Sequence, residues 1–540
     1  MGTVYTNQTL NIPELRREIL SHLTSKSWGK KRKSLLACAL ACRNWRDDAL
    51  DILWKSVGDI ETIARAFGHI KRRDTSNPDD KMLVFEDTPN WERFHTMYSH
   101  RVRVLNINYT QKKHSCIVEA LSDTQPSSVG RGFFPKLRGM RVDIEAESSP
   151  ARAVEFFIQF MHQQVKSFRV DLDFNDPESP HILPIRILEA IRDHTPHLTS
   201  LRLDFVNTTI DQKLVEEIGT LCSRLADLKG LAIPHLASCD ASLMVREIAR
   251  SCTNLETLNI YAMRGFRPST GIIPFSFLKK FSVPESAVGG VVSLLENHPM
   301  LKLRNLEVYA DYLETPSATF AECQQLFRII GSLTELEKLT FRPTVEQRLP
   351  FHIIRPLLQC SAIRSIDMKH INMSMIDDDL SFLGRCLPQL EDLRWCPLES
   401  AGLNQNHEEL LLPTLQGIIN LAEHAVNLRH LEIEIIPIYR TGSTELEVDT
   451  LSSFNCLEHL EFCFSCLDPS WSRAVSVILS HVLPFDCQFS WDNRSEYLDD
   501  GNDATHEANV RSDAAWQKVL DNLDFYWWTQ SVFVTLPSQT

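Results

Sequence analysis

Few residues in this 540-residue sequence have the types and spacing that chemistry requires. Cys463 and Cys466 form a single CxxC pair, a spacing found in structural zinc sites. A zinc site of that kind needs further ligands at matching spacing, and none lies near this pair in the sequence. The chain's 14 cysteines lie mostly inside apolar runs, where we expect reduced and buried thiols. The sequence therefore predicts no metal and no cofactor.

Histidine and glutamate recur at matching positions in two later segments, His430, Glu432 and Glu434 and then His459 and Glu461. Stacked His–Glu pairs are capable of holding a metal ion, but solvated pairs are the preferred interpretation at surface positions of this kind. The sequence contains no phosphate-binding loop, no GxGxxG between a strand and a helix, no HExxH and no GxSxG. We therefore predict no catalytic residues and a protein that is not an enzyme.

An arginine two residues before an aspartate occurs in three consecutive segments. The pairs are Arg141 with Asp143, Arg169 with Asp171, and Arg202 with Asp204. On parallel strands in register, they form an arginine column beside an aspartate column. The preferred interpretation is a surface that neutralises its own charge. The alternative is a binding site for a substrate of matching charge, so these six residues are the candidate substrate-binding residues.

The elements that position these residues belong to a repeat. The pattern apolar-x-x-apolar-x-apolar occurs in fourteen copies, with middle positions from 105 to 489 about 30 residues apart. Each copy predicts a short strand, and helical stretches such as 210–221 lie between copies. Because strands pack more closely than helices, we predict an α/β horseshoe with parallel strands inside and helices outside. A doubly wound parallel sheet is the alternative, disfavoured because no glycine-rich turn accompanies the strands.

Charge divides the chain into two parts. Residues 1–73 hold 14 Lys or Arg and 7 Asp or Glu, a net +7, whereas the whole chain carries −14, which leaves −21 for the remainder. Such a division favours two modules with different partners, and the acidic part disfavours nucleic acid because phosphate binding needs clustered Lys and Arg. The apolar run 35–42 is too short to span a membrane, and the opening residues lack the apolar segment of a secretory signal. We expect no membrane partner and a cytoplasmic or nuclear location.

The basic part begins with a predicted three-helix head. Asn11 is a candidate N-cap, Pro13 suits the first turn, and apolar residues at 12, 15, 19 and 23 predict the first helix. A polar loop over 24–33 precedes a second helix over 34–45 and a third segment over 47–54. The apolar residues exceed what about 57 residues can bury, so part of them is expected to face a partner.

The order of these residues resembles an F-box. The resemblance rests on four pieces in order: Ile12-Pro13-Glu14-Leu15; Ile19-Leu20 with Leu23; Leu40-Ala41-Cys42-Arg43-Asn44-Trp45; and Ala49 with Leu53-Trp54. Ala41 stands where the family more often has valine, and the loop over 24–33 is longer and more basic than usual. The repeats are similar to the leucine-rich repeats found behind F-boxes, so the whole chain resembles a fungal-type F-box protein with C-terminal leucine-rich repeats.

This resemblance implies a substrate-recognition subunit of a Skp–cullin–F-box ubiquitin ligase. The head would bind a Skp-type adaptor and, through it, the cullin, while the repeats would bind an unknown protein substrate. The alternatives are a non-degradative scaffold that uses its repeats for protein binding, and a repeat-type GTPase activator, disfavoured because no Arg or Asn outside the columns stands out. The implied adaptor-binding residues are Pro13, Glu14, Leu15, Ile19, Leu20, Leu23, Leu36, Leu40, Cys42, Trp45, Leu53 and Trp54.

The predicted organisation has five parts. They are an F-box helical domain (1–57), a helical linker (58–98), a leucine-rich-repeat array (99–491), an acidic mobile loop (492–513) and a C-terminal cap (514–540). The cap interpretation rests on the aromatic run 525–528, because an open end of a repeat array must cover its last apolar layer. An aromatic docking site is the alternative for that run.

Overall fold

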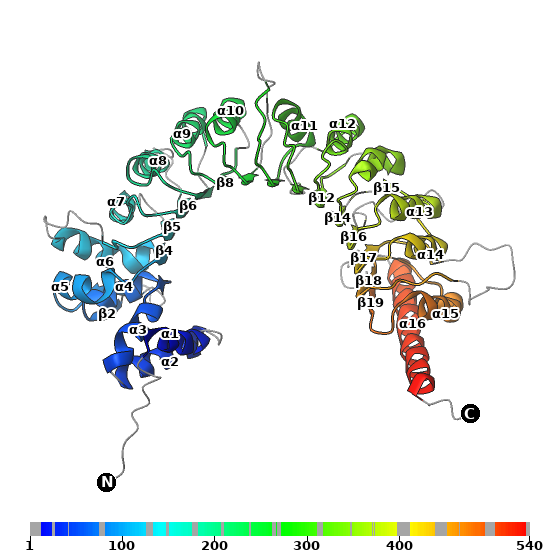
Figure 1. Cartoon of the computed structure of the whole chain (residues 1–540), viewed down its shortest axis with the longest axis horizontal. Coiled ribbons are helices and arrows are strands. Elements are labelled where there is room, and N and C mark those ends of the chain that lie inside the picture. The colour runs from blue at the N-terminus through cyan, green and yellow to red at the C-terminus, as the bar shows by residue number, and fades with distance from the viewer. Residues whose placement is uncertain are drawn as a thin grey trace, which may run out of the picture. The chain divides into compact units, whose positions relative to one another are not determined.

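The structure, a computed structural model, is described in two units, Met1–Leu255 and Glu256–Thr540. The described residues are 12–23, 28–41, 43–74, 81–125, 133–146, 151–174, 182–206, 210–236, 239–261, 266, 272–309, 317–345, 348–369, 371, 373–396, 411–437, 451–463, 465–491 and 503–535. In each unit the strands lie on one side and the helices on the other (Figure 1). Among the described residues, no helix combines the length and the apolar character needed to cross a bilayer.

The first unit begins with three helices and continues into strand–helix repeats. Its helical head and linker comprise α1 (Pro13–His22), α2 (Trp28–Ala41), α3 (Arg43–Leu53), β1 (Ser56–Val57), α4 (Ile60–Phe67), β2 (Ile70–Asp74), β3 (Lys81–Phe85), α5 (Trp91–Phe94) and the π-helical turn η3 (His95–Ser99). Its repeats comprise β4 (Val104–Thr110), α6 (Gln111–Thr124), β5 (Gly139–Ala146), α7 (Ala151–Ile158), β6 (Ser167–Phe174), α8 (Ile182–His194), β7 (Ser200–Val206), α9 (Gln212–Cys222), β8 (Gly230–Ile233) and α10 (Ser242–Ser251).

The second unit consists of repeats and a final long helix. Its first half comprises β9 (Thr257–Ile260), β10 (Lys280–Pro284), α11 (Val288–Asn297), β11 (Asn305–Tyr309), α12 (Phe320–Ile330), β12 (Lys338–Arg342), β13 (Leu349–Pro350), the 3₁₀ helix η4 (Phe351–Gln359), β14 (Ser365–Asp367), β15 (Met373–Ser374) and α13 (Asp377–Cys386). Its second half comprises β16 (Asp392–Trp395), α14 (Leu415–His424), β17 (His430–Ile433), β18 (His459–Phe462), the 3₁₀ turn η7 (Pro469–Trp471), α15 (Ser472–Val482), β19 (Gln488–Trp491) and α16 (Asp503–Thr535).

The repeat strands of each unit pair in parallel and follow the chain order, whereas β2–β3 and β13–β15 form separate two-stranded sheets. The first unit has the order β1-β4-β5-β6-β7-β8, and the second has β9-β10-β11-β12-β14-β16-β17-β18-β19. This sequential order confirms the predicted leucine-rich-repeat-type fold within each unit. It rules out the doubly wound alternative there, because a doubly wound sheet reverses its strand order part-way.

The predicted middle positions of the repeats form the core. In the first unit the paired middle residues are Leu105, Met140, Phe168, Leu201 and Leu231. In the second they are Leu258, Phe281, Leu306, Leu339, Ile366, Leu393, Leu431, Leu460 and Phe489. All are buried. Burial of one such side chain stabilises the fold by roughly 1.5–3 kcal/mol, so the apolar columns hold successive repeats together.

Three predicted elements differ from the structure. The basic run 30–33 lies inside α2 and not in a loop, because Lys and Arg are good helix formers and extend the helix toward its N-terminus. The predicted helical linker 58–98 also contains the antiparallel hairpin β2–β3. Residues 503–513, predicted as part of a mobile loop, belong to α16, where Ser512 Oγ accepts a hydrogen bond from the Leu467 amide at 2.9 Å.

Two further expectations concern single residues. α1 begins at Pro13 with Ile12 as its N-cap, and the predicted cap Asn11 lies outside the described residues. The cysteines are also not all free, since a disulfide joins Cys396 and Cys463, 67 residues apart in the sequence. The repeat explains this exception, because each of the two cysteines comes directly after the last residue of a strand in the same sheet.

Candidate protein-interaction site

The head is organised around a small apolar core. Leu20 of α1, Leu35 and Ala39 of α2, and Ala49 of α3 are its buried members. Half-buried side chains pack against this group, namely Leu23, Cys38, Trp45, Leu50, Ile52 and Leu53. Each of the three helices therefore packs one face against this core, and its opposite face points away from the core.

Apolar side chains also cover part of the outward side of the head. Ile12, Leu15 and Ile19 are 44%, 41% and 39% exposed, and they recur at steps of three and four along α1. Leu36 and Leu40 of α2, four residues apart, are 48% and 79% exposed. A surface helix normally turns such a stripe toward its core. Stripes that face solvent on two helices are a common feature of protein-interaction surfaces.

The structure divides the predicted adaptor-binding residues into two groups. The exposed group is Pro13, Glu14, Leu15, Ile19, Leu36 and Leu40. The group inside the head is Leu20, Leu23, Trp45, Leu53 and Trp54, with the Trp54 ring packed 4.4 Å from the ring of Tyr98. Cys42 lies outside the described residues. The exposed group is positioned to contact a partner, while the inner group holds the helices that present it.

Ion pairs that the sequence did not predict fix the helices of the head. Asp48 of α3 is 7% exposed and accepts hydrogen bonds from Arg16 Nε at 2.9 Å and from Arg17 Nε at 3.1 Å. Its two partners lie on α1, so this carboxylate joins the first and third helices. The sequence alone gives no signal for a pair more than 30 residues apart.

A buried arginine forms a second set of ion pairs, which connect the head to the segment before the first repeat strand. Arg101 is 8% exposed, donates to Asp47 Oδ1 at 3.0 Å and also pairs with Asp51. Both aspartates lie on α3, whereas Arg101 precedes the first repeat strand β4. The guanidinium is buried, but the Asp47 and Asp51 side chains are 63% and 51% exposed, so solvent screens these pairs. Arg101 thus links α3 of the head to the chain just before β4.

The predicted arginine and aspartate columns form as expected in the first unit. Arg141, Arg169 and Arg202 lie side by side in register on β5, β6 and β7. Two residues further along the same strands, Asp143, Asp171 and Asp204 also lie side by side. Within the columns, Arg141 Nε lies 2.9 Å from Asp143 and its Nη2 lies 3.3 Å from Asp171. Arg169 Nη2 lies 2.8 Å from Asp171, and Arg202 Nη2 lies 3.5 Å from Asp204. The six side chains share one half-exposed surface on which their charges are largely matched.

The pKa values of the neighbouring carboxyl groups of Asp143 and Asp171 shift in opposite directions. Burial is the main cause that raises the pKa of Asp143, and the nearby Asp171 adds to it. Burial would also raise the pKa of Asp171, but hydrogen bonds from Arg169 and Asp143 and the charges of both arginines outweigh it and lower that pKa. Asp143 therefore takes up a proton more readily than Asp171, which lies between two arginines.

The second unit places its predicted His and Glu residues on β17, β18 and the chain just after β17. His430 pairs in register with His459, and Glu432 with Glu461. Glu432 forms ion pairs with Lys369 and, at 3.9 Å, with Arg394, while His459 Nε2 lies 3.6 Å from Glu461. Glu434 is 8% exposed and follows β17. The His–Glu pairs thus lie in a ladder of alternating charges, and the described contacts do not gather them into one metal site.

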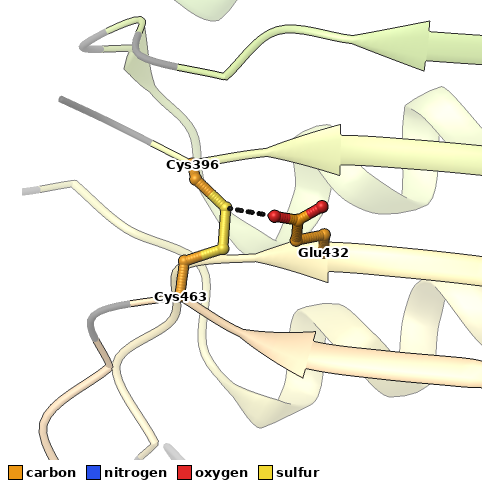
Figure 2. Close-up of side chains that lie close together, drawn as sticks. All are labelled: Cys396, Glu432 and Cys463. Carbon is orange, nitrogen blue, oxygen red and sulfur yellow. Dashed lines mark hydrogen bonds between the residues drawn. A yellow bond between two sulfur atoms is a disulfide. The ribbon is translucent and has the colours of Figure 1, made fainter. Parts of the chain in front are cut away.

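The CxxC pair is not brought together as a site. Cys466 is exposed, whereas Cys463 is 2% exposed and is joined to Cys396. Glu432 lies beside this disulfide, with its Oε1 3.8 Å from Cys396 Sγ (Figure 2). Cys396 was not predicted as part of any site. A signal was present, since both cysteines follow the third apolar position of a repeat, two repeats apart.

The C-terminal helix covers the last repeat of the second unit. Trp516 of α16 is 1% exposed, with its ring 5.4 Å from that of Phe462 and 5.7 Å from that of Phe489. Of the two predicted capping tryptophans, Trp527 is 8% exposed but Trp528 is 62% exposed. Trp516, which the sequence did not single out, makes the central contact of the cap.

Comparisons with known proteins find matches among solved structures. No family model and no curated protein matches the sequence. Among solved structures, the chain is similar to one from a complex of Rad7 and Elc1 in yeast, at 14% identity and a TM-score of 0.39, over 76% of this chain and 94% of that one. It is also similar to a protein from Bacteroides fragilis, at 15% identity and a TM-score of 0.26, over 42% of this chain and 74% of that one. A third similar structure is that of a TLR13–ssRNA13 complex, at 12% identity and a TM-score of 0.31, over 69% of this chain and 59% of that one.

Proposed function

We propose that this protein is the substrate-recognition subunit of a Skp–cullin–F-box ubiquitin ligase. The observation that carries the proposal is the outward apolar surface of the head, formed by the N-cap Ile12 with Leu15 and Ile19 of α1, and by Leu36 and Leu40 of α2. These residues belong to the stretch that resembles an F-box, and they are exposed because the head core takes its apolar side chains from the opposite faces. A Skp-type adaptor is the partner that the resemblance implies for such a surface.

The repeats supply the second half of the proposal. Successive parallel strands present charged columns such as those built on Arg169 and Asp171, on a rigid support of buried apolar residues. A rigid array of side chains suits the recognition of a protein. The chain itself would contribute no catalytic group. It would raise the effective concentration of the substrate's lysines near a ubiquitin-carrying enzyme that the cullin recruits.

The proposal predicts a defined set of co-purifying proteins. The tagged full chain should recover a Skp-type adaptor and a cullin together, and the Leu15→Asp/Leu40→Asp variant should lose both. Leu243→Asp is the matched control, because Leu243 lies on α10 of the same unit and is 58% exposed. Recovery of the adaptor without the cullin would favour a non-degradative scaffold. Failure to recover either protein, with a folded chain, would contradict the proposal.

A further inference from the structure

The strongest unassigned chemistry lies in the second unit, where two sulfur atoms and a carboxylate meet. Cys396 follows β16, Cys463 follows β18, and Glu432 lies on the intervening strand β17 (Figure 2). One donor atom from each of the three residues lies within 4.8 Å of the others. The three repeats therefore bring together donors that are separated by up to 67 residues in the sequence.

We propose that Cys396, Glu432 and Cys463 form a binding site for a thiophilic divalent cation of the zinc class when the two cysteines are reduced. Thiolate and carboxylate ligands are a normal zinc set, with metal–ligand distances of about 2.3 Å for sulfur and about 2.0–2.2 Å for oxygen. Donors that already lie within 4.8 Å of one another can reach a common ion at these distances with side-chain rotation alone. Three protein ligands leave a fourth position for water or for a group from a partner.

Burial and charge favour the same assignment. Cys396 and Cys463 are 5% and 2% exposed, so a bound ion would be shielded from competing ligands in solution. Two thiolates and the Glu432 carboxylate carry −3, which a divalent ion reduces to −1. Lys369 and Arg394 lie against Glu432 and supply positive charge for the remainder. A buried charge of this kind needs such partners.

The disulfide and the metal site are alternative states of the same two sulfurs. Two molecules of a small thiol, of the glutathione class, reduce the disulfide: two electrons and two protons pass to Cys396 and Cys463, and the small thiols become one disulfide. Binding of the ion then releases the two thiol protons to solvent, because thiolates are the ligands. The metal would join β16, β17 and β18 in the reduced protein, as the disulfide joins the strand ends in the oxidised one.

Cobalt titration of the full chain tests the site directly. After reduction with a phosphine and removal of the reductant without oxygen, Co²⁺ should give a thiolate-to-cobalt charge-transfer band that saturates at about one ion per chain, and Zn²⁺ should abolish it. Cys396→Ser and Cys463→Ser should each remove this band. Glu432→Gln should keep the sulfur band, alter the visible cobalt bands and weaken binding at least about tenfold.

The chain provides its own controls. Cys466→Ser and Cys456→Ser change exposed cysteines, so both should bind cobalt as the unmodified chain does. The oxidised chain should show no charge-transfer band. Circular dichroism confirms that each variant is folded, and Glu432→Gln tests the site without removing a thiol. A band that survives in Cys396→Ser but is lost in Cys466→Ser would overturn the proposal, as would the absence of a stoichiometric band in the reduced chain.

Discussion

Leu20 is fully buried in the core of the head, while Leu15, five residues earlier on the same helix, is 41% exposed. At about 100° per residue, their side chains lie about 140° apart around the α1 axis. One leucine therefore holds the helix in place, and the other is free to contact a partner. This separation makes it possible to test folding and binding of the head independently.

The two leucines should respond differently to truncation. Leu20→Ala should destabilise the head by roughly 2–5 kcal/mol, because it leaves a cavity in a core of few residues. Leu15→Ala should change its stability by less than about 1 kcal/mol. Hydrogen–deuterium exchange of peptides from α1, α2 and α3 in the full chain measures both. Equal protection in the two variants would show that the core is not arranged around Leu20.

The arginine column should contribute to substrate capture. The variant in which Arg141, Arg169 and Arg202 are all alanine leaves three aspartates without their matched charges, and capture of the substrate should fall about tenfold or more. Adaptor binding should stay unchanged. The matched control replaces three ion-paired arginines of the helices of the same repeats, Arg152, Arg186 and Arg192. Equal loss in both triple variants would assign the effect to net charge and not to the column.

Acid should destabilise the first unit through His114. This side chain is 6% exposed, and its Nδ1 accepts a hydrogen bond from the Thr110 amide at 3.0 Å. Burial is the main cause that lowers the pKa of His114 to about 4. The unfolded chain, with a histidine pKa of about 6.5, takes up the proton first as the pH falls. Stability is therefore complete above about pH 6.5 and is lost as the pH falls toward 4, by about 3 kcal/mol in total.

The His114→Asn variant separates this effect from other acid effects. Asparagine does not titrate in this range, and its Oδ1 can accept the same hydrogen bond from the Thr110 amide. The free energy of opening of α6, measured by hydrogen exchange and corrected for the intrinsic effect of pH, should fall between pH 6.5 and 4 in both proteins. The fall should be about 3 kcal/mol smaller in the variant than in the unmodified chain. An identical fall in the two proteins would mean that His114 is not the group responsible.

The C-terminal cap should depend on Trp516. Trp516→Ala should destabilise the last repeats of the second unit by roughly 3–5 kcal/mol, since it exposes the rings of Phe462 and Phe489. Trp528→Ala, at a side chain that is 62% exposed, is the control and should change little. Thermal melting and binding of an apolar dye report the two effects. If the Trp516→Ala protein has the same melting temperature as the unmodified chain, α16 does not cap the array.

The repeat pattern predicted the strands well because the signal is periodic and repeated. The middle residue of each of the fourteen copies lies on a paired strand, and even Phe489 in the weakest copy pairs with Leu460. Elements without that period were missed. β1 has two residues, too few to show alternation, and the hairpin of β2 and β3 stands outside the repeat.

The candidate site was predictable only where neighbouring repeats align it. The arginine and aspartate columns were predicted because equal spacing places equal residues side by side. In the head, the periodicity identified the apolar residues of α1 but not their direction, so Leu20 and Leu15 received the same role. Predicting the contact of Cys396 with Cys463 requires comparing repeats that are two apart and not adjacent ones. The pair of Arg101 with Asp51 follows no sequence period.

The most direct test of the account is calorimetry of the full chain with a purified Skp-type adaptor. The Leu15→Asp/Leu40→Asp variant introduces two charges into the outward apolar surface, and it should lose roughly 2–4 kcal/mol of binding free energy, about 30- to 1000-fold in affinity. The control Leu243→Asp should bind as tightly as the unmodified chain. Circular dichroism and exchange protection of Leu20's helix verify the fold. Equal adaptor affinity of the double variant and the unmodified chain would contradict the assignment of this surface.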